Sequence, residues 1–196
     1  FVPDSFAQPF RSNYFGHDLE AALFFKGIKN SDEARKKATE YADAHPEMDF
    51  LDQYSNDGSW MCHYYFTAEE ILTELGKLGS TPTHFISGIG SGGSLIGIGK
   101  KLKEKTKTKI IGLESKIPHV IKGLRCLNGE NTPTVYSNSQ DIVDYLKKID
   151  PDKVFSFRAE HACSWGVSAC ANLYIARQLS QELDKGIIVT IIPDRV

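Results

Sequence analysis

The sequence predicts an α/β fold built on a parallel sheet. Three apolar runs have the composition of buried strands: THFISGIG (83–90), KIIGLES (109–115) and GIIVTIIPD (186–194). The stretch between the first two, SLIGIGKKLKEK (94–105), has a helical pattern, so the three segments form a strand–helix–strand unit. The last run is rich in β-branched residues, which is typical of a central strand that is buried on both faces.

The first third of the chain is expected to hold two helices and one strand. Asn30 and Glu33 resemble a capping pair at the start of a helix over residues 31–44. The segment FLDQY (50–54) is interpreted as a short strand, and SNDGS after it has turn chemistry. Thr67 and Glu70 are spaced as a capping box, which predicts that the next helix begins at that point.

The second half is expected to be largely helical until its final strand. Residues 115–138 contain two prolines and two glycines and are predicted to be a loop. Three helices are then predicted, over residues 139–149, 152–162 and 167–183.

Composition excludes several classes of function. The formal net charge of −2 gives no reason to expect a nucleic acid or an anionic membrane as partner, and no apolar stretch reaches the length of a membrane span. The four cysteines have no CxxC spacing, so we expect reduced thiols in a cytoplasmic protein. His63, His119 and His161 have no ligand spacing with a cysteine, and no metal site is predicted.

A glycine-rich turn between the first strand and its helix is the main candidate site. Glycines there bring backbone N–H groups close to an anion, and the following helix adds its positive end. The candidate phosphate-binding residues are Gly90, Ser91, Gly92, Gly93 and Ser94. The alternative is a tight strand–helix turn that binds nothing, with glycines retained for packing.

The same glycines also match a dinucleotide pattern. Gly88, Gly90 and Gly93 satisfy G-x-G-x-x-G, and Glu114 ends the next strand, where an acid could bind a ribose. A nucleotide-binding module is therefore a remote alternative.

The wider sequence resembles the cystathionine β-synthase and cysteine synthase family. Three motifs occur in the family's order: Gln53-Tyr54-Ser55-Asn56, Thr67-Ala68-Glu69-Glu70-Ile71, and the turn from Gly90 to Ser94. The resemblance covers about residues 45 to 194. It implies a three-layer fold of the tryptophan-synthase-β type, called fold type II of pyridoxal 5'-phosphate enzymes, and it makes the turn the cofactor's phosphate loop. It also implies a β-synthase-like domain over 46–196 behind a diverged segment, 1–45, with the N-terminal subdomain truncated or missing.

Other parts of the family's chemistry are not found. The family's aldimine lysine lies in an S-x-K-D/N-R segment, and the nearest match, Ser31 to Arg35, has Glu33 at the lysine position. Lys26 and Lys29 are close by but are interpreted as surface lysines. The Ser-Gly-Asn substrate loop has no match. No catalytic residue is therefore assigned, and we expect no covalently bound cofactor.

The pyridine end of the cofactor site also departs from the family. In an ungapped alignment Val167 replaces the serine that meets the ring nitrogen, although a shift of one residue would place Ser168 there. Trp165 replaces a glycine, and its indole would tend to fill the ring pocket. Gly123-Leu124-Arg125 stands where the family has G-I-G, and Arg125 is interpreted as a solvated loop residue rather than as an anion ligand.

These departures favour a non-catalytic module of a cystathionine β-synthase-like protein. Its expected role is to support a catalytic β-synthase module in transsulfuration, in the same polypeptide or in another subunit of a homodimer or pseudo-dimer. The alternative is part of an active β-replacement enzyme that joins serine and homocysteine or makes cysteine from an activated serine.

Overall fold

The computed structural model describes residues 28–128, 132–161 and 164–193. The chain divides into two compact units, Phe1–Asp52 and Gln53–Val196, and each is described by itself. The boundary predicted between residues 45 and 46 stays a prediction.

The first unit contains helix α2 (Ser31–Ala44), which has the predicted cap. Asn30 Oδ1 accepts hydrogen bonds from the backbone N–H groups of Asp32 and Glu33, each at 3.0 Å. Glu33 Oε2 in turn accepts from the backbone N–H of Lys29 at 2.8 Å. The reciprocal pattern confirms the capping pair, and it assigns the Glu33 carboxylate to the start of a helix.

Residues 50–54 form no strand, so that prediction was wrong. The backbone of Asp52 has a φ of 23°, outside the extended region. Its carboxylate accepts two hydrogen bonds from the Arg35 guanidinium, at 2.8 and 2.6 Å. A bidentate ion pair and a turn, rather than strand pairing, therefore hold this segment.

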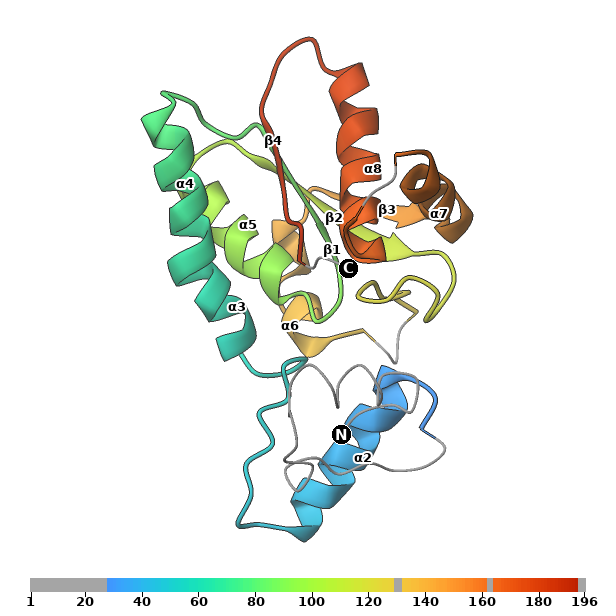
Figure 1. Ribbon diagram of the computed structural model, residues 1–196. Coiled ribbons are helices and arrows are strands. Elements are labelled where there is room, and N and C mark those ends of the chain that lie inside the picture. Colours follow the sequence, from blue (N-terminus) through green and yellow to red (C-terminus); the bar gives the residue numbers. More distant parts are fainter. Residues whose placement is uncertain (1–27, 129–131, 162–163, 194–196) are drawn as a thin grey trace. The chain divides into compact units, whose positions relative to one another are not determined.

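Within the described residues of the second unit, a four-stranded parallel sheet has the order β3-β2-β1-β4 (Figure 1). The strands are β1 (His84–Gly88), β2 (Lys109–Ser115), β3 (Tyr145–Ile149) and β4 (Ile188–Thr190). The register places Phe85 opposite Ile110 and Val189. The parallel α/β architecture is thus confirmed, although β4 is shorter than the run over 186–194 suggested.

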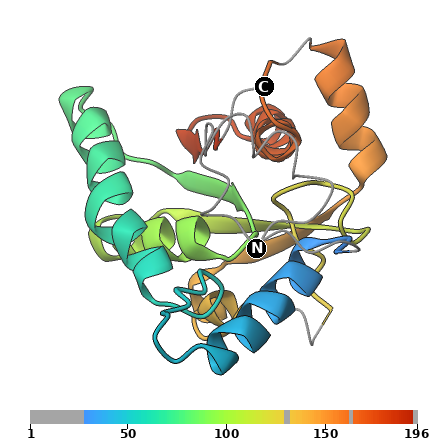
Figure 2. The ribbon, with the colours of Figure 1, turned by 60° about the horizontal axis from the view of Figure 1, so that its bottom comes forward.

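Helices cover both faces of this sheet and make three layers (Figures 1 and 2). One face carries α4 (Ala68–Lys77) and α5 (Gly93–Lys105), and the other carries α7 (Pro151–Glu160) and α8 (Val167–Glu182). Neighbouring residues of β1 point to opposite faces: Phe85 packs with the α5 cluster and Ile86 with the α8 cluster, and both are fully buried. Burial on both faces explains why Phe85 and Ile86, which are neighbours in the strand, are both apolar.

Strand β3 replaces most of the helix predicted over residues 139–149. A short 3₁₀ turn, Gln140–Ile142, leads directly into it. Asp144 starts the pairing with β2: its N–H donates to the Ile110 carbonyl at 2.9 Å, and its carboxylate accepts from the Ile110 N–H at 2.8 Å. The open edge of β2 therefore overrides the local helical pattern.

The helix around Thr67 begins earlier than predicted, so the capping box was wrong. Helix α3 (Gly58–Cys62), a π-helical turn (His63–Thr67) and α4 follow one another without a break. The Asn56 side chain accepts from the Gly58 N–H at 2.8 Å at the start of α3, and Thr67 has helical dihedrals and no capping hydrogen bond. The predicted loop 115–138 also contains a short helix, α6 (Thr134–Ser137).

Candidate phosphate-binding site

The glycine-rich turn joins β1 to the first residue of α5. Gly92 has a φ of 93°, a left-handed conformation that favours glycine, and α5 begins at Gly93. The Gly93 N–H donates to Ser91 Oγ at 3.3 Å, whereas among the described residues no acceptor faces the N–H groups of Gly90, Gly92 or Ser94. Free N–H groups at a helix N-terminus form a binding site for an anion.

The glycines themselves are required by packing. A Cβ at Gly90 would lie 2.9 Å from the Gly123 carbonyl oxygen, and one at Gly92 would lie 2.9 Å from Tyr136 Cβ. A Cβ at Gly93 would collide with the Ser59 carbonyl oxygen. Close packing therefore accounts for the glycines whether or not the turn binds a phosphate.

A chain of side-chain hydrogen bonds holds the hydroxyl of Ser94. Ser94 Oγ lies 3.2 Å from His63 Nε2, and His63 Nδ1 lies 3.0 Å from Thr67 Oγ1. Burial lowers the pKa of the His63 imidazole, which favours the neutral ring. A neutral ring has one N–H, so it donates to one hydroxyl and accepts from the other. The sequence predicted that Ser94 belongs to the site, but it did not predict His63. The spacing of four residues between His63 and Thr67 on one helix was the signal that could have revealed their contact.

A second polar group that the sequence did not reveal lies beside the turn. Ser59 Oγ is buried and has no hydrogen-bond partner among the described residues. It lies 3.3 Å from the position that a Cβ on Gly93 would occupy. A buried hydroxyl without a partner is costly unless a ligand satisfies it. The free N–H groups and this hydroxyl therefore fit the phosphate of a cofactor such as pyridoxal 5'-phosphate.

The segment from Ile121 to Arg125 lies along the glycine turn. The Arg125 N–H donates to the Ile89 carbonyl at 2.7 Å, and the Leu124 side chain lies 2.5 Å from the position of a Cβ on Gly88. The Arg125 guanidinium carbon is 4.4 Å from the centre of the Tyr54 ring, and the residue is half-buried. Arg125 is therefore packed on an aromatic ring, and the interpretation as a solvated loop residue was wrong.

Ser168 rather than Val167 faces this segment. Ser168 is 8% exposed, and its Cβ and Oγ lie 3.2 and 3.3 Å from the position of a Cβ on Gly123. Val167 and Trp165 pack against the apolar cluster on the α8 side of the sheet. That Trp165 fills the space for a cofactor ring stays a prediction.

Glu114 does not present its carboxylate to a ribose. The residue is 1% exposed, and Oε2 accepts a hydrogen bond from the Leu127 N–H at 2.8 Å. Oε1 lies 3.5 Å from Lys148 Nζ. The acid that the dinucleotide pattern requires is thus engaged inside the protein, which removes the main support for a nucleotide site at this turn.

Only one of the two lysines near the family's lysine segment lies within the described residues. Lys29 is exposed, as expected for a surface lysine, and Lys26 lies outside the described residues.

In the part of the chain that the structure describes, no group of His, Cys, Asp or Glu residues could hold a metal ion. None of the described helices is both long and apolar enough to cross a bilayer.

The fold and the turn together define a parallel α/β protein with a candidate phosphate-binding turn at a strand–helix junction. Comparison with known proteins identifies the family within this class. The family model for pyridoxal-phosphate dependent enzymes matches residues 15–194, and the chain belongs to that family.

The curated relatives that the chain matches first are named cysteine synthases. Cysteine synthase from Aquifex aeolicus is 32% identical over 159 residues, which cover 74% of this chain and 46% of the relative. Cysteine synthase B from Escherichia coli is 26% identical over 99% of this chain and 63% of the relative. The structure of an O-acetylserine dependent cystathionine β-synthase from Helicobacter pylori matches with a TM-score of 0.71 and 29% identity, over 87% of this chain and 57% of that one. The chain thus spans about half the length of the curated relatives that it matches first.

Proposed function

We propose that this chain is a non-catalytic β-synthase-like module that binds the phosphate group of pyridoxal 5'-phosphate without forming a covalent bond to it. The observation that carries the proposal is the set of N–H groups of Gly90, Gly92 and Ser94, which have no acceptor among the described residues, beside the unsatisfied Ser59 hydroxyl. Ser94, held by His63, supplies a further hydroxyl for a phosphate oxygen.

The missing lysine is the reason for a non-catalytic role. When bound, the cofactor supplies an electron sink for the substrate's α-carbon, and in this family a lysine must anchor it and move the proton. At the nearest match to the lysine segment, Ser31 to Arg35, this chain has Glu33, whose carboxylate caps α2. A carboxylate forms no Schiff base.

We propose a supporting role for the chain on the basis of its resemblance to β-synthases. Its relatives are cysteine synthases, and one similar structure is a cystathionine β-synthase. We infer that the chain stabilises or regulates a catalytically complete β-synthase module in transsulfuration. That module belongs to the same polypeptide or to another subunit, in a homodimer or pseudo-dimer.

The test is a titration of the purified chain with pyridoxal 5'-phosphate, followed by borohydride reduction and peptide mass mapping. We expect saturable binding that inorganic phosphate displaces, and no lysine that carries a reduced pyridoxyl group. Ser94→Ala should weaken binding roughly threefold to tenfold, because it removes a hydroxyl donor to a charged group. Ser137→Ala is the matched control, since its exposed hydroxyl bonds only to the local Thr134 carbonyl. A pyridoxyl-lysine peptide would refute the non-catalytic role.

The second candidate is part of an active β-replacement enzyme. This chain covers 46% and 48% of the length of the first two curated relatives. A lysine segment could therefore belong to a part of the protein outside this sequence, and that possibility favours the second candidate. A longer gene product that contains an S-x-K-D-R segment and makes cysteine from O-acetylserine and sulfide would favour this candidate over the first.

A further inference from the structure

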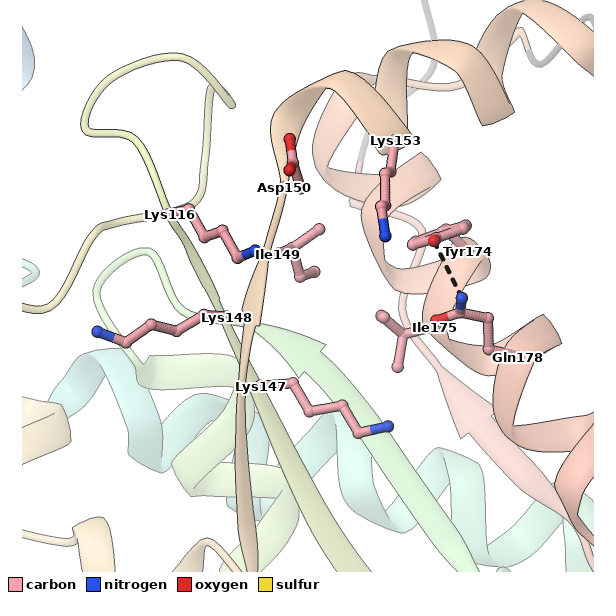
Figure 3. A pocket seen from close by; sticks show the side chains of 9 residues that line it. All are labelled: Lys116, Lys147, Lys148, Ile149, Asp150, Lys153, Tyr174, Ile175 and Gln178. Carbon is pink, nitrogen blue, oxygen red and sulfur yellow. Dashed lines mark hydrogen bonds between the residues drawn. The ribbon is translucent and has the colours of Figure 1, made fainter.

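A lysine-lined cavity lies on the α8 side of β3, away from the glycine turn in sequence and built from different elements (Figure 3). Its volume is about 260 Å³. Its walls come from the residue after β2, from β3, from the first turn of α7 and from α8. The lining residues are Lys116, Lys147, Lys148, Ile149, Asp150, Lys153, Tyr174, Ile175 and Gln178.

The four lysines of the lining differ in their ion pairs. Lys148 lies on the opposite side of the strand from Lys147 (Figure 3) and pairs with Glu114 at 3.5 Å. Among the described residues no ion pair is formed by Lys116, Lys147 or Lys153. Positive charge is therefore in excess at one concave site, whose lining holds a single carboxylate, Asp150.

The one carboxylate in the lining is already engaged. Asp150 caps α7, where its Oδ1 accepts from the Asp152 N–H at 3.1 Å. Its negative charge offsets part of the positive charge of the lining, where four lysines remain in excess over one carboxylate. The excess of ammonium groups favours an anion.

Protection of a sheet edge does not explain this arrangement. Lysines on an edge strand prevent edge-to-edge aggregation, and β3 is an edge strand, so Lys147 has that explanation. Lys116 and Lys153 lie outside the strand, yet in Figure 3 their side chains extend toward Ile149 and Tyr174. Protection of an edge therefore does not account for Lys116 and Lys153 in the lining of the cavity.

We propose that this cavity binds a small organic phosphate. Lys116, Lys147 and Lys153 would hold the phosphate oxygens, and the cavity has room for a small apolar or ring-shaped group as well. Ile149 and Ile175 provide an apolar wall. Tyr174 provides a ring face and a hydroxyl, which accepts a hydrogen bond from Gln178 Nε2 at 2.9 Å and keeps its own proton for the ligand.

Adenosine 5'-monophosphate is a suitable probe, with binding measured by titration calorimetry on the full chain and mapped by amide NMR shifts. We expect shifts at Ile149, Lys153 and Ile175. The double variant Lys116→Gln/Lys153→Gln should weaken binding at least roughly tenfold, because it removes two charge-assisted hydrogen bonds. Lys107→Gln, an exposed lysine outside the cavity, is the matched control and should leave binding unchanged.

The result must be separated from binding at the glycine turn. Ser94→Ala should not affect binding to the lysine-lined cavity, whereas it weakens binding at the turn. Failure of the double variant to weaken binding, or shifts confined to residues 90–94, would overturn the proposal and leave the proposed function intact. Absence of binding at millimolar concentration would overturn it too. Citrate that binds as tightly as the probe would refute the assignment to a phosphate.

Discussion

Replacement of Gly97 by alanine tests the close approach of two helical segments that shapes the candidate site. A Cβ at this position, in the middle of α5, would collide with the Trp60 carbonyl oxygen and lie 2.8 Å from His63 Cβ and 3.0 Å from the Tyr64 backbone nitrogen. Two of these three atoms belong to the backbone of α3 and the π-helical turn. They cannot move by a simple change of side-chain rotamer, so the two segments must separate.

The expected loss of stability follows from two opposing effects. Extra methyl groups in a packed interior cost about 1–3 kcal/mol, and a backbone collision belongs at the upper end of that range. Alanine regains about 1 kcal/mol over glycine in helix propensity. We therefore expect Gly97→Ala to lower the free energy of unfolding by about 2 kcal/mol, which corresponds to a fall in Tm of about 4–8 °C for a chain of this size.

Gly76→Ala is the matched control, since a Cβ at Gly76, also in a helix, would meet nothing within 4 Å. It should raise the free energy of unfolding by about 0.5–1 kcal/mol. Urea unfolding monitored by circular dichroism measures both variants. If Gly97→Ala is as stable as the parent chain, the helices are not in contact through this glycine, and the argument from close packing fails.

Three further changes probe the polar groups around the turn. Asn172→Leu should lower the free energy of unfolding in urea by about 2–4 kcal/mol. Asn172 is 2% exposed, and its side-chain amide accepts from the Gly88 N–H at 2.8 Å and donates to the Ile191 carbonyl at 2.9 Å. A loss below about 1 kcal/mol would contradict this role. Because the pKa of His63 is lowered in the folded chain, the unfolded chain binds a proton at higher pH than the folded chain does. The free energy of unfolding should therefore fall as the pH drops below about 6.5, and His63→Gln should make it depend less on pH. A His63 imidazole that titrates in NMR at or above its ordinary pKa would disprove this. Ser59→Ala should stabilise the free chain by up to about 1 kcal/mol while it weakens phosphate binding, and a variant that is less stable and binds normally would show that the hydroxyl is satisfied.

The sheet was predictable where the chain is buried on both faces. The runs over β1 and β2 are mostly apolar, because both of their faces are covered, and that pattern is visible in the sequence. Strand β3 was not predictable in this way. It lies at the edge of the sheet and carries Lys147 and Lys148, so its pattern fits a solvated helix as well as a strand, and only the pairing of Asp144 with Ile110 decides between them.

The candidate site was predictable in its backbone and not in its supporting side chains. Glycines between a strand and a helix identify the turn from Gly90 to Ser94 directly. The contact of Ser94 with His63 joins residues 31 positions apart, and it depends on a π-helical turn that no local pattern indicates. The predicted capping box at Thr67 failed for the same reason: its hydroxyl bonds to His63 instead of to a helix N-terminus.

The polar atoms beside the turn, and not its glycines, therefore support phosphate binding at this place. Each glycine of the turn meets protein where its side chain would be, so packing alone would keep glycine at these positions. Packing does not explain why Ser59 buries a hydroxyl without a partner, nor why His63 holds the Ser94 hydroxyl beside free N–H groups. A buried donor without a partner lowers stability, and its cost is offset when an anion is bound. Opposite effects of Ser59→Ala on stability and on phosphate binding would thus separate a retained binding site from a turn that is only well packed.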